Sequence, residues 1–445
     1  MSIMDNLTPK EIVSYLDKYV IGQNDAKKTI AVALRNRYRR MQLSEDMQQD
    51  VTPKNILMIG STGVGKTEIA RRLAKMMNLP FIKVEASKYT EIGFVGRDVE
   101  SMIRDLAATS MQIVRESENE KNKEKIENYI ENKIIEKLLP PLPVGASEQK
   151  KVEYDASFIR MQEKFSKGEL DHLKVKIEVP NNPQLPEDGL PPQMIQVQES
   201  IVKVLGGMGK KGPEKEISVK DAKKILEEEA SEVLLDEETL KSIALEKVEK
   251  GGIVFLDEID KVAVSANSQG RQDPSKEGVQ RDLLPIVEGS TVHTKLGMVK
   301  TDHILFIAAG AFHVSKPSDL MPELQGRFPL RVELDSLNEE TLYRILTEPN
   351  NSLIKQYEAL LKVEGVTLIF EESALRAIAG YSLQANEKTE DIGARRLHTV
   401  MEKILEEISF EADEHHGEKI VVDEVLVKKK IGSVVEDEDT TRYIL

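Results

Sequence analysis

Apolar and polar positions alternate along the chain in patterns that predict helices joined by short buried strands. Near the start, four residues recur at helical spacing and define one face of an amphipathic helix: Ile12, Tyr15, Leu16 and Tyr19. Thr8, Pro9 and Glu11 are typical of the beginning of that helix, because a threonine cap and a glutamate three residues later form a capping box. Residues 20–23 interrupt the pattern, and a second helix is predicted over 24–40.

Three segments that contain short apolar runs predict strands buried on both faces, at residues 54–59, 252–256 and 301–310. Helical patterns separate these runs, which is the arrangement of a parallel sheet with flanking helices. Towards the C-terminus the pattern turns mostly helical, with one strand at 366–370. A helix opening at Arg395 carries its apolar residues on one face: Leu397, Val400, Met401, Ile404, Leu405 and Ile408. We therefore predict an α/β fold followed by a small α+β C-terminal domain.

The first two apolar runs lie much farther apart than one helical connection requires, which predicts an inserted domain. The insertion is rich in charged helical patterns, and its Pro- and Gly-rich pieces at 140–143, 180–183 and 206–209 are typical of loops. A chain of 445 residues is also long enough for two or three domains. We predict an α/β domain in two parts, at 1–110 and 244–332. A largely helical insertion lies between them at 111–243, and a small C-terminal domain follows at 333–445.

One glycine-rich motif stands between the first predicted strand and a helical pattern, and it reads Gly60-Ser61-Thr62-Gly63-Val64-Gly65-Lys66-Thr67. This is the phosphate-binding pattern G-x-x-x-x-G-K-[ST] in the strand-loop-helix context that supports it. The main-chain N–H groups of such a loop surround phosphates at a helix N-terminus. We expect Lys66 to reach the β and γ phosphates of ATP and Thr67 to hold Mg²⁺. The alternative is a glycine-rich turn that binds no nucleotide.

Two carboxylates, Asp257 and Glu258, directly follow the second apolar run. In doubly wound sheets, an aspartate at the carboxyl end of a buried strand lies beside the phosphate loop, where it can hold Mg²⁺ through a water molecule. Glu258 is then placed to polarise an attacking water, which indicates hydrolysis of the nucleotide. The alternative is a solvated acidic turn after a core strand.

Together these motifs resemble the HslU (ClpY) family of AAA+ unfoldases, which belongs to the Clp/Hsp100 group. The resemblance covers essentially the whole chain, including residues 19–23, the two nucleotide motifs, the long insertion and the end at 442–445. It implies a homohexameric ring that hydrolyses ATP to unfold tagged or unfolded proteins. It also implies that the ring threads them into an HslV-like threonine peptidase and activates that partner.

The resemblance gives roles to residues outside the two nucleotide motifs. It implies that Val20 and Ile21 pack on the adenine and that Arg395 touches the nucleotide from the C-terminal domain. Arg327, beside a glycine in a proline-bounded turn, would be the arginine finger that reaches the neighbouring subunit's nucleotide. Without the resemblance, an arginine in a turn is usually a solvated charge or a surface ion pair. The third strand ends on alanines and a glycine where many AAA+ proteins have asparagine, so a sensor-1 residue stays unassigned.

A second glycine-bounded segment is typical of a loop that binds an extended polypeptide, and it reads Gly93-Phe94-Val95-Gly96. The glycines would weaken any helix or strand there, so Phe94 and Val95 are poorly placed for a core. As a pore loop at the centre of a ring, the two apolar side chains would hold an extended chain without sequence preference. The alternative is a turn whose Phe94 tucks into the domain.

The chain ends on three large apolar residues, Tyr443, Ile444 and Leu445, after an acidic run. Most chain ends are frayed, yet such residues favour burial. The family resemblance implies that this tail docks into the peptidase.

Composition narrows the alternatives. The formal charge of −15 argues against nucleic acid as the main partner, and no apolar stretch is long enough for a bilayer, so we expect a cytoplasmic protein with no membrane partner. Without cysteine, the chain has neither thiolate nucleophiles nor cysteine-ligated metals.

Three other functions share the phosphate loop: a GTPase or small-molecule kinase, a DNA-directed AAA+ motor and a non-catalytic scaffold. A GTPase or kinase is disfavoured because the chain has no guanine-recognition signature. A DNA-directed motor is disfavoured because Phe94 stands where a basic loop would be expected, and a scaffold is disfavoured because Glu258 indicates hydrolysis.

Overall fold

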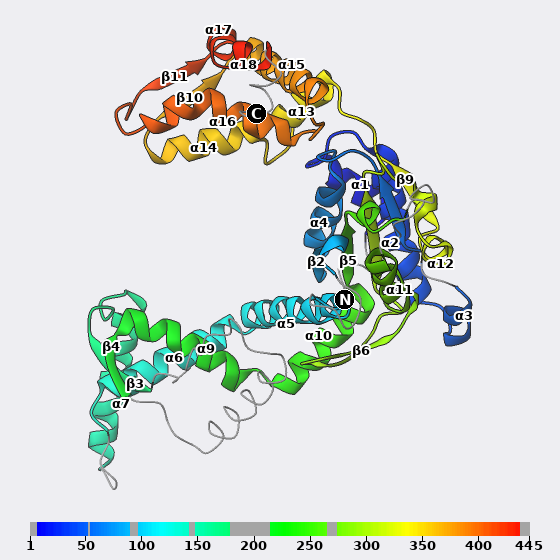
Figure 1. Ribbon diagram of the computed structural model, residues 1–445. Coiled ribbons are helices and arrows are strands. Elements are labelled where there is room, and N and C mark those ends of the chain that lie inside the picture. The colour runs from blue at the N-terminus through cyan, green and yellow to red at the C-terminus, as the bar shows by residue number, and fades with distance from the viewer. Residues whose placement is uncertain are drawn as a thin grey trace. The chain divides into compact units, whose positions relative to one another are not determined.

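The computed structural model describes residues 7–51, 54–89, 97–141, 147–178, 214–264 and 274–436. These residues divide into two compact units. The first contains those within Met1–Ile113 and Lys241–Leu445, and the second those within Val114–Leu240. The second unit is the cyan-to-green part of Figure 1 that carries α6, α7 and α9. Each unit is described separately below.

A parallel sheet of five strands organises the first unit, in the order β2-β5-β8-β1-β9. The strands are β1 (Ile56–Ile59), β2 (Phe81–Glu85), β5 (Ile253–Asp257), β8 (Leu305–Gly310) and β9 (Leu330–Glu333). Ile59 is paired with Gly310, and Glu85 with Asp257, so the carboxyl ends of these strands share one edge of the sheet. That edge is where a doubly wound sheet binds its ligand.

The three predicted strands are confirmed, although each begins later than predicted. The third begins at Leu305, later than expected from its apolar run, because a turn precedes it in which the Ile304 N–H donates to the Thr301 carbonyl at 3.0 Å. The edge strands β2 and β9 were not predicted.

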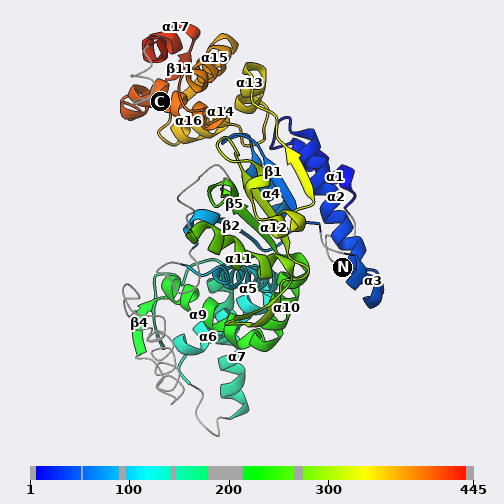
Figure 2. The same ribbon diagram turned by 45° about the vertical axis from the view of Figure 1, so that its right-hand side comes forward.

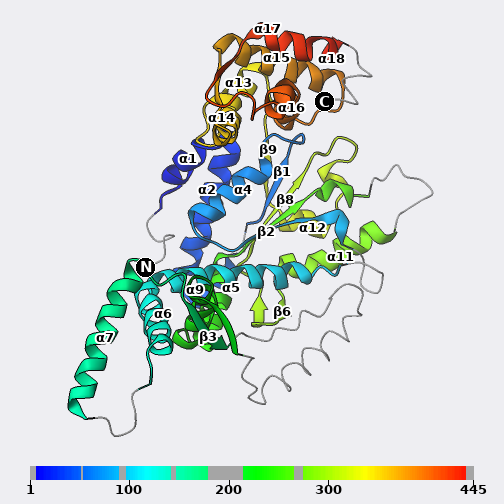
Figure 3. The same ribbon diagram turned by 90° about the vertical axis from the view of Figure 1, so that its left-hand side faces the viewer.

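Alternating side chains of the strands supply two separate cores, one on each face of the sheet. On β5, Ile253 and Phe255 belong to one core, and Val254 and Leu256 belong to the other. The first core is covered by α1 (Pro9–Asp17), α2 (Asn24–Met41) and α4 (Lys66–Met76). The second is covered by α5 (Ser101–Lys121), α11 (Pro274–Glu288) and α12 (Pro322–Arg327). Figure 3 shows α2 and α4 on one side of the strands and α11 and α12 on the other.

Local sequence signals explain several element boundaries in this unit. The capping box that starts α1 is present, because the Glu11 N–H donates to the Thr8 hydroxyl and the Thr8 N–H donates to the Glu11 carboxylate. The turn expected around Arg327 is instead the short helix α12, which begins at Pro322, where proline is favoured. The remaining elements of this part are α3 (Glu45–Asp50), α10 (Glu237–Gly251) and the antiparallel pair β6 (Thr291–Thr294) and β7 (Gly297–Lys300).

The C-terminal part of the first unit has its own core, to which four longer helices and a two-stranded sheet contribute. These are α13 (Glu339–Thr347), α14 (Leu353–Val363), α15 (Glu372–Lys388), α16 (Arg395–Phe410), β10 (Thr367–Phe370) and β11 (Lys419–Val422). Figure 2 shows these elements in yellow to red, with α17 (Glu424–Val427), and α18 (Ser433–Glu436) follows. The predicted apolar face of α16 is confirmed, since Leu397, Val400, Met401, Ile404 and Leu405 are buried.

The second unit is mostly helical, with α6 (Lys123–Leu138), α7 (Glu148–Ser166) and α9 (Val219–Leu234). Ser218 caps α9, because its hydroxyl accepts from the Asp221 N–H. The antiparallel strands β3 (Lys174–Glu178) and β4 (Glu214–Ser218) were not predicted. They pack with α6 and α9 around a small core that includes Ile130 and Leu226. Across both units, no helix among the described residues is long and apolar enough to span a bilayer.

Candidate functional site

The glycine-rich motif forms the turn between β1 and α4, at the carboxyl edge of the sheet. Gly63 and Gly65 adopt positive φ angles of 75° and 102°, a region that favours glycine. The helix begins at Lys66, so the main-chain N–H groups of its first turn are free of intrahelical partners. The turn therefore presents N–H donors and the positive end of a helix dipole, which together suit an anion.

Lys66 lies folded over this turn. Its Nζ donates to the carbonyl oxygens of Gly60 and Ser61, the latter at 2.7 Å. Burial lowers the pKa of Lys66, while the nearby carboxylates of Asp257 and Asp260 favour its charged form. The ammonium group is thus partly desolvated and held by weak neutral acceptors, a setting in which an added phosphate would be a stronger partner.

Asp257 ends β5, and Glu258 is the first residue beyond it. The Asp257 carboxylate forms an ion pair with Lys83 of β2 at 2.8 Å and accepts from the Glu258 N–H at 3.1 Å. Glu258 has a positive φ of 56°, which is uncommon for a residue with a side chain. Its side chain accepts a 3.3 Å hydrogen bond from the Ser87 hydroxyl, and the carboxylate is otherwise exposed to solvent and ligands among the described residues.

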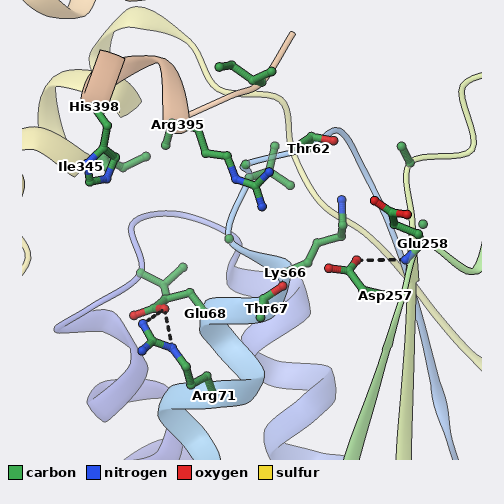
Figure 4. Close-up of a pocket in the computed structure, with 18 of the residues that line it drawn as sticks. Thr62, Lys66, Thr67, Glu68, Arg71, Asp257, Glu258, Ile345, Arg395 and His398 are labelled. Carbon is green, nitrogen blue, oxygen red and sulfur yellow. Dashed lines mark hydrogen bonds and ion pairs between the residues drawn. The ribbon is translucent and has the colours of Figure 1, made fainter. Parts of the chain in front are cut away.

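A cavity of about 1340 Å³ joins these groups. Among its lining residues are eleven that the sequence singled out: Val20, Ile21, Thr62, Gly63, Val64, Gly65, Lys66, Thr67, Asp257, Glu258 and Arg395. Figure 4 shows Lys66, Asp257 and Arg395 directed towards the same space, with Glu258 beside them. Ser61 does not line the cavity, and it contributes instead the carbonyl that holds Lys66.

The segment that carries Val20 and Ile21 is fixed by buried polar groups. Lys27 reaches back from α2 and donates to the Val20 carbonyl and to Asp17. Gln23 is only 4% exposed, and its amide is paired with the main chain of Asp335, with both hydrogen bonds at 2.9 Å. These contacts fix a segment whose two apolar residues, Val20 and Ile21, line the cavity.

Arg327 lies outside the cavity. It ends α12, and its guanidinium forms an ion pair with Glu288 of α11 at 2.7 Å, with the arginine side chain 43% exposed. The structure therefore does not bring Arg327 together with Lys66 and Glu258 of the same chain. The expected pore loop, Gly93, Phe94, Val95 and Gly96, and the expected docking tail, Tyr443, Ile444 and Leu445, lie outside the described residues.

Several cavity residues were missed by reasoning from sequence. His398 lies three positions after Arg395 on α16, and this spacing could have identified it as a neighbour on the same helical face. Asp260, which also lines the cavity, accepts from the Phe312 N–H at 3.4 Å and so joins the end of β5 to the loop after β8. Lys83 does not line the cavity but pairs with Asp257, and no local pattern marks it because that contact depends on β2 lying beside β5.

Comparisons with known proteins agree with this geometry. The sequence matches the ATPase family associated with various cellular activities (AAA) over residues 56–132 and the AAA domain of the Cdc48 subfamily over residues 188–331. The ATP-dependent protease ATPase subunit HslU of Campylobacter jejuni is 63% identical over 440 residues, which cover 99% of this chain and 100% of that protein. This chain belongs to the HslU family. The proteins of the same name from Helicobacter acinonychis and Helicobacter pylori are each 59% identical over 440 residues, with 99% of both chains covered.

Membership of the HslU family confirms the resemblance read from the motifs. The chain is an AAA ATPase and binds a nucleotide. The donor set of the cavity also fits Mg²⁺, because Thr67 and Asp257 carry a hydroxyl and a carboxylate on its wall and Mg²⁺ prefers oxygen donors. The cavity of this chain thus combines anion-binding N–H groups, a lysine, two carboxylates and an arginine.

Proposed function

We propose that this HslU-family chain uses ATP hydrolysis to unfold proteins and to thread them into an HslV-like threonine peptidase, which it activates. The observation that carries the proposal is the cavity, where Lys66, Asp257, Glu258 and Arg395 meet at the carboxyl edge of the sheet. The name of the relatives, ATP-dependent protease ATPase subunit, supports the coupling to proteolysis.

Each residue has a distinct proposed task at the nucleotide. Val20 and Ile21 pack on the adenine, while residues 61–65 and Lys66 hold the phosphates with main-chain N–H groups and an ammonium. Thr67 directly, and Asp257 through water, hold Mg²⁺, which supplies charge neutralisation at the phosphates when bound. Glu258 orients the attacking water and accepts its proton. Arg395 contacts the nucleotide from the C-terminal part of the unit.

Arg327 is proposed to act on the nucleotide of a neighbouring subunit in a homohexameric ring. Its distance from the cavity of its own chain and its exposure both suit a residue that works in trans. Its pairing with Glu288 gives the guanidinium a defined resting place before a phosphate replaces the carboxylate. We propose that the ring acts in the cytoplasm on unfolded or tagged proteins, with no role for nucleic acid or membrane.

Replacing Phe94 with alanine tests the unfolding step. We expect the variant to keep its basal ATPase rate and its assembly but to degrade a stably folded substrate at least about tenfold more slowly, because the main apolar contact with the threaded chain is lost. Degradation should be followed with a folded fluorescent protein and with a small unstructured peptide, which needs little pulling.

Phe410→Ala is the matched control, since Phe410 is a highly exposed phenylalanine at the end of α16. It should degrade the folded protein at the parent rate. If the Phe94 variant unfolds the stable substrate at full speed, Phe94 does not grip the chain.

Deleting residues 443–445 tests the partnership with the peptidase. We expect the truncated protein to retain ATPase activity and assembly but to lose stimulation of an HslV-like peptidase, because three apolar side chains and the terminal carboxylate are removed from the docking site. A synthetic peptide of about the last eight residues should stimulate the peptidase without ATP. Normal stimulation by the truncated motor would show that docking uses another surface.

A further inference from the structure

We propose that Arg396 is a positioning residue for the nucleotide: together with Asn386 it fixes the 389–394 loop, and this loop in turn fixes the phosphate-binding turn. The inference rests on the proposed nucleotide site and adds to it a second arginine with a different task. The main chain of residues 392–394 lies directly against that of residues 62–63. The geometry of the phosphate-binding turn is therefore set partly from the C-terminal part of the unit.

The two consecutive arginines have opposite surroundings. Arg395 is exposed and lines the cavity. Arg396 is 4% exposed and faces the inside of the C-terminal part. Its guanidinium donates to the Asn386 side-chain oxygen at 3.1 Å, to the Thr389 hydroxyl at 2.8 Å and to the Glu390 carbonyl at 2.9 Å. Burial lowers the pKa of Arg396, and the carboxylates of Asp391 and Glu390 oppose that effect.

Asn386 extends this network to the rest of the loop. Its side chain is 8% exposed and comes from the last turn of α15. The amide nitrogen donates to the Gly393 carbonyl at 3.0 Å, and the amide oxygen accepts from Arg396 and, at 3.4 Å, from the Ile392 N–H. Arg396 and Asn386 therefore bind main-chain groups of residues 390, 392 and 393, which leaves this loop little freedom.

The loop contacts the phosphate-binding turn without intervening side chains. The Ala394 N–H donates to the Gly63 carbonyl at 3.2 Å. A Cβ atom on Gly63 would lie 2.1 Å from the Ile392 carbonyl oxygen, and one on Gly393 would lie 2.5 Å from the Thr62 carbonyl oxygen. Gly393 also has a positive φ of 59°. Neither position accepts a side chain unless the two main chains separate.

This contact makes the position of the turn depend on the loop. Because the turn binds phosphates through its main-chain N–H groups, a small shift of residues 62–63 would misalign those donors. If Arg396 were purely structural, it would only join α15 to α16. Its replacement would then affect nucleotide binding independently of the contact between Gly63 and Gly393.

A double-mutant cycle on the full chain separates these roles. The probe is ADP, and its affinity is measured by calorimetric titration for the parent, Arg396→Lys, Gly393→Ala and the double variant. Lysine keeps the charge but cannot form the forked hydrogen bonds of arginine. We expect each single change to weaken ADP binding about tenfold, and the double variant to be no weaker than either single variant.

If the two effects multiply, so that the double variant binds about a hundredfold more weakly, Arg396 is merely structural and the inference is overturned. Unchanged ADP affinity in Arg396→Lys overturns it as well. Thr389→Val serves as a milder second variant, which removes one partner of Arg396 at similar volume and should weaken ADP binding about threefold. If the parent protein itself fails to bind ADP, the proposed nucleotide site is wrong, which is a different outcome.

Discussion

Replacing Glu258 with glutamine is expected to lower the rate of ATP hydrolysis by about a hundredfold or more while ATP stays bound. Glutamine has almost the same shape, so the hydrogen bond from Ser87 and the end of β5 should persist. The amide cannot accept the proton of the attacking water, however, and the chemical step slows. Steady-state phosphate release measures the rate, and retention of ATP on the isolated protein measures the binding.

The matched control is Glu340→Gln, the same substitution at an exposed position of α13 that does not line the cavity. It should hydrolyse ATP at the parent rate. A near-normal rate in Glu258→Gln would remove Glu258 from the chemistry and leave it as a solvated residue after a core strand.

Replacing Lys66 with threonine is expected to weaken nucleotide binding by at least about a hundredfold, because a partly desolvated ammonium makes charge-assisted hydrogen bonds to phosphate that threonine cannot make. The two carbonyls of residues 60 and 61 that now accept from Lys66 would also lose their partner. Titration with ADP and ATP measures the affinity. The variant should lose hydrolysis because it fails to bind, in contrast to Glu258→Gln.

Arg327→Ala provides the comparison, since Arg327 does not line the cavity of its own chain. It should bind nucleotide normally as an isolated subunit and lose turnover only in the assembled ring. Equal loss of affinity in the isolated subunit and in the ring would contradict action in trans. Tight ADP binding by Lys66→Thr would contradict the placement of the phosphates beside Lys66.

The strands at the centre of the sheet could be predicted because burial on both faces leaves only apolar residues in them, as in β1, β5 and β8. The edge strands escaped prediction for the opposite reason. β2 contains Lys83 and β9 contains Arg331, and both of these charged residues are exposed, so neither strand gives a continuous apolar run. Strands β3 and β4 pair across a large gap in sequence, which no local pattern reveals.

The residues of the candidate site also divide into those that the sequence predicted and those that it did not. Residues 61–67, Asp257 and Glu258 belong to contiguous motifs whose spacing carries the chemistry, and they were found. Lys83, Asn386 and Gln23 act through contacts between distant segments, such as Gln23 with Asp335, and sequence spacing contains no trace of those contacts. The domain boundaries proposed from sequence and the roles of Phe94 and the C-terminal tail remain predictions.

The paired amide of Gln23 affects where the α/β domain can be truncated for experiments on an isolated fragment. A recombinant fragment of the α/β domain that stops at Glu333, the natural end of β9, would lack Asp335 and leave both polar atoms of Gln23 without their partner. Each unsatisfied buried group costs about 1–3 kcal/mol, and the strain would fall on the segment carrying Val20 and Ile21. Such a fragment could fold and still give a misleading nucleotide affinity. A boundary placed beyond Asp335 keeps the amide paired.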